Sequence, residues 1–165
     1  MFSIKIESLF LKKLTELVEL VKGITGEESA EWGKMEIQHM LEHLILMMKI
    51  STEKLNVNLL VEESKIDFYK ELVLQDKPFE KNLNNPLLGE EPSQLIFGNV
   101  EIAKKKFIDE FNNFEEFFTN QNNKKTLHPL LGYITKEEWT KYHIKHLSHH
   151  LVQFGLYEYR DSLYN

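Results

Sequence analysis

The chain has 165 residues, the size of one ordinary domain, and its 20 basic and 26 acidic side chains give a formal net charge of −6. This balance argues against a nucleic-acid-binding protein, because phosphate binding needs clustered Lys and Arg. The absence of cysteine excludes disulfides, thiolate metal sites and cysteine nucleophiles, so a metal would have to be held by nitrogen and oxygen atoms. With 42% apolar residues the chain can fill a core, and we expect a single domain over residues 1–165.

No targeting or membrane segment is apparent. The first 20 residues mix charged side chains into their apolar pattern, whereas a targeting segment has a basic head and a clean apolar run. The longest uninterrupted apolar stretch, residues 44–48, is far shorter than the roughly 18 residues that indicate a membrane span. We therefore expect a cytoplasmic protein that does not associate with membranes.

Apolar residues recur at three- and four-residue steps in four long segments, and almost nothing alternates with the period of two that indicates strands. The start of the last segment is marked by a capping box, Thr135 with Glu138. The four predicted helices cover about residues 3–21, 35–53, 98–119 and 135–157.

The connection between the second and third helices is long. It holds a weaker, short helix at about residues 62–74 and then a predicted crossover loop over residues 76–93, which contains three of the four prolines. Residues 120–134 are predicted to form a second loop. The expected fold class is therefore all-α: a four-helix bundle with a long crossover connection between helices two and three.

Four of the seven histidines lie within eight residues of the last helix. At about 100° per residue, His143, His146 and His150 share one face with Trp139, while His149 lies to one side. A buried imidazole nitrogen without a partner costs about 1–3 kcal/mol, and a metal ion removes that cost because neutral imidazole is a common ligand. His146 and His150 have the i, i+4 spacing that brings two ring nitrogens to one point.

The second helix offers another pair with this spacing, His39 and His43, and its apolar arc lies nearer to His43. We therefore predict a three-nitrogen site of His43, His146 and His150 with open positions, which are typical of catalytic metals. Residues 39–43 also spell the H-x-x-E-H signature of inverted zinc proteases, with Glu42 as the base, but such short matches arise by chance and the chain is small for that class.

These residues resemble the DinB-like (YfiT-type) superfamily of metalloenzymes. On the last helix, His146-Leu147-Ser148-His149-His150-Leu151-Val152-Gln153 matches the family's doubled histidine followed by glutamine, and Met40-Leu41-Glu42-His43 matches the segment that supplies the remaining histidine. One branch of the superfamily is matched more closely, through Trp32-Gly33-Lys34-Met35, Lys77-Pro78-Phe79 and the run from His128-Pro129 to Gly155-Leu156.

The resemblance implies a four-helix bundle that binds a divalent metal, commonly zinc or nickel, through His43, His146 and His150. His39 and His143 remain open as substitutes for one of these ligands. The resemblance also implies frequent homodimers and, in some members, metal-dependent transfer or isomerisation that uses a low-molecular-weight thiol.

The leading hypothesis is a metal-dependent hydrolase or thiol transferase acting on a small molecule. The metal would activate a bound water or a substrate thiolate. Nearby side chains, Glu42, His143, His149 and Gln153, would orient ligands or move protons. The alternative is a non-enzymatic dimeric helical bundle whose histidines form a metal-free network or hold a structural ion.

His128, which precedes a proline, is predicted to be a loop residue.

Overall fold

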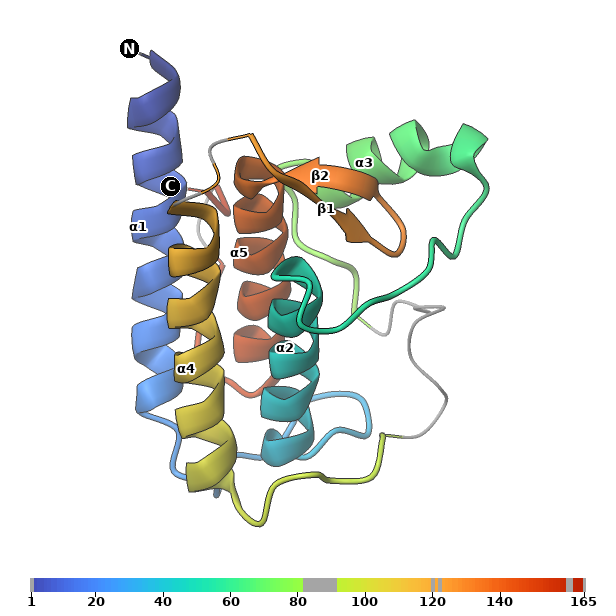
Figure 1. Ribbon diagram of the computed structural model, residues 1–165. Coiled ribbons are helices and arrows are strands. Elements are labelled where there is room, and N and C mark those ends of the chain that lie inside the picture. Colours follow the sequence, from blue (N-terminus) through green and yellow to red (C-terminus); the bar gives the residue numbers. More distant parts are fainter. Residues whose placement is uncertain (1, 82–91, 120, 122, 160–161, 165) are drawn as a thin grey trace.

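The computed structural model describes residues 2–81, 92–119, 121, 123–159 and 162–164. In this part of the chain the long helices lie side by side as a bundle, with α2 packed on α4 and α1 packed on α5, and the two strands and a short helix lie at one end (Figure 1). The elements in chain order are α1 (Phe2–Lys22), α2 (Ile37–Ser51), the 3₁₀ turn η1 (Glu63–Lys65), α3 (Ile66–Leu74), α4 (Val100–Thr119), β1 (Lys125–His128), β2 (Gly132–Thr135) and α5 (Lys136–Gln153).

The expectation of a purely all-α four-helix bundle is wrong, because residues 125–135 form an antiparallel hairpin instead of a loop. Its register runs from Lys125 opposite Thr135 to His128 opposite Gly132. Each strand has only four residues, so the alternation of buried and exposed side chains is too short to stand out in the sequence. Gly132 closes the three-residue turn with φ +67°, a left-handed conformation that glycine adopts without strain.

The hairpin joins the ends of the two helices that carry the predicted metal ligands. The indole Nε1 of Trp139 on α5 donates to Thr126 Oγ1 at 2.7 Å, and Thr126 Oγ1 donates to the carbonyl of Ser51, the last residue of α2, at 2.9 Å. All three residues are buried, and a hydrogen bond lost there would leave an unsatisfied polar group. Thr126 therefore fixes the relative position of α2 and α5.

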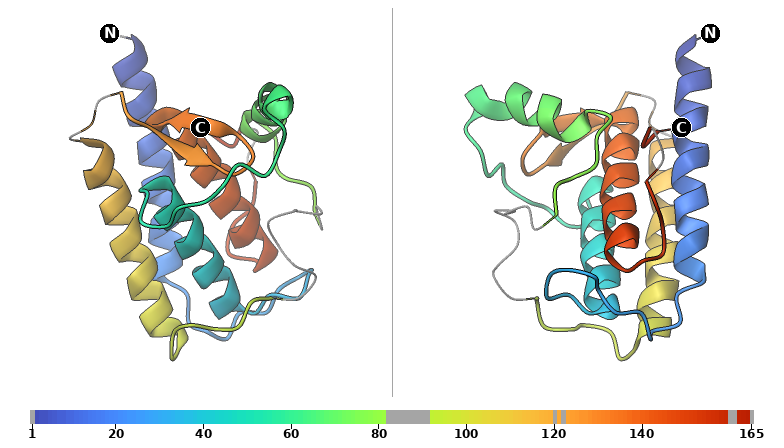
Figure 2. Two further views of the ribbon diagram at one scale, coloured as in Figure 1. Left: turned by 45° about the vertical axis from the view of Figure 1, so that its right-hand side comes forward. Right: turned by 180° about the vertical axis from the view of Figure 1, so that it is seen from behind.

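The ends of α5 are set by local sequence. Its N-terminus has the predicted capping box, in which Thr135 and Glu138 each accept a backbone amide of the other. The helix ends at Gln153, before the predicted end at residue 157, because Gly155 adopts φ +66° and closes a Schellman motif. In that motif Leu156 N donates to Leu151 O at 2.8 Å. The chain then turns back along α1, as the rear view in Figure 2 shows.

The connection between α2 and α4 contains the predicted short helix as η1 and α3. The predicted loop over residues 76–93 lies in part outside the described residues, since residues 82–91 are not described. α3 is held against α5 by Lys145, whose ammonium donates to the carbonyls of Leu72 and Gln75 at 3.4 and 3.3 Å. The positive charge of Lys145 at these carbonyls also interacts favourably with the negative C-terminal end of the α3 helix dipole.

α5 is buried on most of its sides. The predicted inward residues are buried, and Lys145 and Ser148 on the opposite side of the wheel are also only 1% and 0% exposed, because α1 and α3 cover that side. In the described residues, no helix is long and apolar enough to cross a lipid bilayer.

Candidate metal centre

Three histidines from two helices meet inside the bundle. His146 Nε2 lies 2.7 Å from Nε2 of His43 on α2 and 3.1 Å from Nε2 of His150, one turn further along α5. One ring nitrogen from each residue lies within 4.8 Å of the other two. The three imidazole edges therefore converge on one point, as the sequence predicts.

All three imidazoles are uncharged at neutral pH. Burial lowers the pKa of His43 to about 4, with a smaller contribution from nearby His149. Burial is also the main cause that lowers the pKa values of His146 and His150 well below the usual range, followed by the repulsion that their protonated forms would meet from protonated neighbouring imidazoles. Metal binding needs neutral imidazoles, so the folded chain presents its ligands in the right charge state.

Protons alone satisfy the three converging nitrogens poorly, whereas a cation would pair with all three. A neutral imidazole has one N–H and one nitrogen lone pair. A single proton on His146 Nε2 can point along only one of the two short contacts, toward His43 or toward His150. In the other contact His146 Nε2 has neither a second proton to donate nor a lone pair to accept with, so no hydrogen bond forms there. A divalent ion would accept all three lone pairs, so this donor set fits zinc, nickel and other metals that bind imidazole.

Gln153 orients one of the ligands. Its Oε1 lies 2.8 Å from Nδ1 of His150, which directs the ring so that Nε2 faces the other two histidines. This is the usual task of a second residue behind a metal-ligating histidine. The contact is the one that an orienting role requires, and the role of Gln153 itself stays a prediction. His146 Nδ1 is buried without a hydrogen-bond partner, and its ring is instead held by packing against the Tyr142 ring at 5.3 Å.

The three histidines of the centre are largely shielded from solvent. His146 and His150 are each 5% exposed, whereas His43 is only partly buried. His149, also partly buried, lies beside the centre with its ring 5.2 Å from that of His150. The rings of Trp32 and Phe79 each approach His149 edge-on at 5.9 Å, so three aromatic side chains form a rim next to the ligands.

His143, predicted to move protons or replace a ligand, lies one turn away from the centre among aromatic rings. It stacks on Trp139 at 5.4 Å and meets the edge of Phe114 at 5.1 Å. Its Nε2 is buried without a partner, and burial lowers its pKa to about 3. The structure does not place His143 among the three converging nitrogens.

Glu42 and His39, the other members of the H-x-x-E-H pattern, point away from the three converging nitrogens. The carboxylate of Glu42 accepts the backbone amides of Ile96 and Phe97 at 2.7 and 3.0 Å, so it anchors the chain that leads into α4. His39 Nδ1 accepts the amide of Glu36 at 3.3 Å and caps α2. The protease arrangement, with both histidines on the metal, is therefore absent from α2, and a catalytic role for Glu42 remains a prediction.

Sequence reasoning missed the role of His128. Instead of lying in a loop, it is buried at the end of β1, and its Nδ1 accepts the amides of Leu130 and Leu131 in the hairpin turn. Its ring packs on Tyr142 at 4.5 Å, behind His146. The β-branched residues and Gly132 around the His-Pro pair were the available signal for a hairpin.

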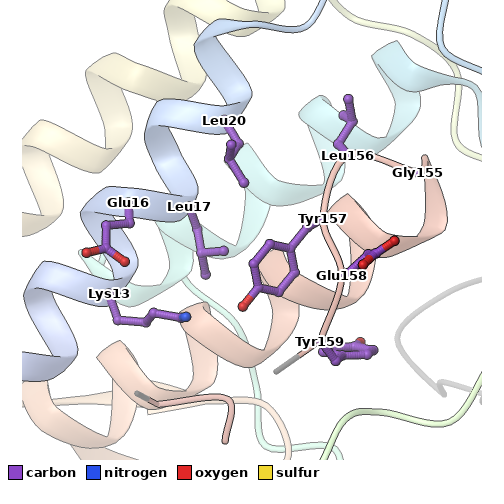
Figure 3. Close-up of a pocket in the computed structure, with 9 residues that line it drawn as sticks. All are labelled: Lys13, Glu16, Leu17, Leu20, Gly155, Leu156, Tyr157, Glu158 and Tyr159. Atoms are coloured by element: carbon purple, nitrogen blue, oxygen red, sulfur yellow. The ribbon is translucent and has the colours of Figure 1, made fainter. Parts of the chain in front are cut away.

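A separate cavity of about 540 Å³ lies between α1 and residues 155–159, and none of the three histidines borders it. Figure 3 shows Lys13 of α1 and Tyr157 pointing toward one another across it. The Lys13 ammonium lies 5.5 Å from the centre of the Tyr157 ring. This cavity is therefore not part of the metal centre.

The family model described as "protein of unknown function (DUF1569)" matches residues 3–155. The chain belongs to this family. The match includes both helices that supply the histidines and the Trp32–Gly33 segment. Searches of curated proteins and of solved structures gave no match.

Proposed function

We propose that this member of the DUF1569 family is a metal-dependent enzyme of DinB-like type, a hydrolase or a thiol-dependent transferase that acts on a small molecule. The observation that carries the proposal is the convergence of three neutral imidazoles, His43, His146 and His150, inside the bundle. Three nitrogen ligands leave positions for a water or a substrate, as catalytic sites do, while structural sites use four protein ligands. Zinc and nickel are the proposed metals.

The remaining residues have separate tasks around the centre. A bound divalent ion would supply Lewis acidity, which lowers the pKa of a coordinated water or thiol. Gln153 holds His150 in its binding orientation, and the aromatic packing of Tyr142 holds His146. His149, at the rim, is the group best placed to exchange a proton with a substrate. Burial lowers its pKa, and a hydrogen bond to the backbone of Phe79 opposes that shift.

The test is metal analysis of protein purified without a histidine tag, followed by a probe of the open positions. We expect about one divalent ion per chain in the wild type and in the His39→Ala control, because His39 caps α2. We expect negligible metal in the His146→Ala/His150→Ala variant. Equal, negligible metal in all three proteins would end the proposal.

The second step separates an enzyme centre from a structural ion. Cobalt-substituted protein would be titrated with a small thiol and with azide while its visible spectrum is recorded. An open site changes its ligand-field bands when either ligand binds, whereas a site closed by four protein ligands does not. An unchanged spectrum at saturating ligand would favour the non-enzymatic bundle. Homodimerisation and action on a small molecule stay predictions.

A further inference from the structure

The side-chain amide of Gln153 is held between two groups of different kinds. Its Oε1 faces His150 Nδ1 at 2.8 Å, and its Nε2 donates to the backbone carbonyl of Trp32 at 2.8 Å, across 121 positions of the chain. A carbonyl oxygen can only accept a hydrogen bond, so the amide NH₂ must face Trp32. The amide oxygen must then face His150, and His150 Nδ1 must carry the ring proton.

This chain of contacts decides which nitrogen of His150 is free to bind. With the proton on Nδ1, the lone pair is on Nε2, the atom that faces His43 and His146. If the amide of Gln153 turned over, its NH₂ would face Nδ1. The ring proton would then move to Nε2, into the space where a cation would sit. The Trp32 carbonyl is the acceptor that prevents this reversal.

Gly33 allows the Trp32 carbonyl to come this close. It adopts φ +80°, and a Cβ atom at this position would lie 2.9 Å from Nε2 of Gln153. The neighbouring amide of Glu31 donates to the backbone carbonyl of Gln153 at 2.8 Å, so this loop holds both the main chain and the side chain of Gln153. A side chain at residue 33 would have to displace the Gln153 amide and would also strain the left-handed backbone.

We propose that Trp32 and Gly33 are positioning residues of the metal centre, which set the tautomer of His150 through Gln153. The inference rests on the proposed function for its biological meaning, but the tautomer itself is a property of the metal-free protein. The loop that carries the Trp32–Gly33 backbone also carries the Trp32 ring at the rim. One segment therefore both sets the His150 tautomer and packs its indole ring against His149.

The first test measures the tautomer directly. Ring-nitrogen NMR of metal-free protein, with the His150 signals assigned by their loss in His150→Ala, should show Nδ1–H in the wild type. Gly33→Ala should shift His150 toward Nε2–H. Gly26→Ala is the matched control, because Gly26 also has a positive φ (+97°) but lies against Val100 rather than Gln153. An unchanged His150 tautomer in Gly33→Ala would overturn the proposal.

The second test uses zinc affinity, measured by competition with a chelator. Gly33→Ala should weaken binding about 10- to 100-fold, the usual effect of losing a residue that orients a ligand, and Gly26→Ala should not. In Gln153→Glu the carboxylate presents an acceptor oxygen to His150 Nδ1 in either orientation, so the contact with the Trp32 carbonyl no longer sets the tautomer. Adding Gly33→Ala to Gln153→Glu should therefore change zinc affinity by less than about threefold. An equal loss in both backgrounds would mean that Gly33 acts through general disruption, which overturns the proposal.

Gly33→Asn is a second variant that keeps the test possible if Gly33→Ala does not fold. Asparagine tolerates the left-handed conformation better than alanine but still brings a Cβ against Gln153, so it should show the same tautomer shift. If the wild type binds no metal at all, the proposed function fails while the NMR result still decides this inference.

Discussion

The Nε2 atoms of His43 and His146 lie 2.7 Å apart, although 103 positions separate the two residues in the chain. The geometry of each helix alone does not direct either side chain toward the other. Their meeting depends on the register of α2 against α5, which the Thr126 hydrogen bonds to Trp139 and Ser51 hold at one end. The histidine cluster is thus tied to the packing of the bundle, so we expect stability and metal binding to respond to each other.

Metal binding should stabilise the fold. A ligand that binds only the folded state at 100 times its Kd raises the free energy of unfolding by about 2.7 kcal/mol. Thermal unfolding with increasing zinc should therefore show a rising Tm in the wild type, reversed by a chelator. His43→Ala should lose this response and His39→Ala should keep it. A zinc response of the same size in His43→Ala would contradict the three-histidine site.

The stability of metal-free protein should fall as the pH is lowered below about 6.5, in part because of His143. Burial lowers its pKa from 6.5 to about 3. Between these values the unfolded chain binds a proton at His143 and the folded chain does not, so the free energy of unfolding decreases by up to about 1.4 kcal/mol per pH unit.

His143→Phe should flatten this dependence by about one proton, because phenylalanine fills the aromatic surroundings without titrating. Urea unfolding at pH 7.5, 6.0 and 5.0 in the presence of a chelator gives the slope of unfolding free energy against pH for the wild type and for the variant. We expect little loss of stability at pH 7.5, since the variant removes a buried nitrogen that has no partner. Identical slopes for the two proteins would show that His143 does not contribute.

Glu42→Ala should loosen the chain before α4 while leaving metal affinity within a few-fold of the wild type. Burial acts to raise the pKa of Glu42, but hydrogen bonds from Gln38, Phe97 and Ile96 outweigh it and lower the pKa, so the carboxylate is charged at neutral pH. We expect the free energy of unfolding to fall by about 1–3 kcal/mol and hydrogen exchange at the amides of Ile96 and Phe97 to become faster. Glu116→Ala, at an exposed position of α4, is the control. Unchanged exchange together with lost metal binding would instead place Glu42 at the centre.

Thr126→Val should destabilise the protein by about 1–3 kcal/mol, because it leaves both Trp139 Nε1 and the Ser51 carbonyl without their buried partner. The matched control is Thr119→Val, whose hydroxyl bonds only to an exposed carbonyl on its own helix. Urea denaturation measures both variants. Equal stability of the two would show that the hairpin does not fix the helices.

The centre could be predicted in large part from local sequence, and the fold could be predicted less completely. Helical spacing alone places His146 and His150 on one face and favours His43 over His39, because these relations follow from about 100° per residue. The hairpin escaped prediction because four-residue strands carry too little alternation, and the end of α5 escaped because Gly155 acts through its backbone conformation rather than through apolar spacing.

The amino-acid sequence by itself determined which imidazoles could reach a common point, since the helix period fixes directions within each helix. Only the tertiary structure decided that α2 and α5 meet with Nε2 atoms in contact, that Glu42 turns to the Ile96 and Phe97 amides, and that Gln153 donates to the Trp32 carbonyl. These contacts join residues far apart in the chain, and they depend on how the whole core packs, which no local pattern encodes.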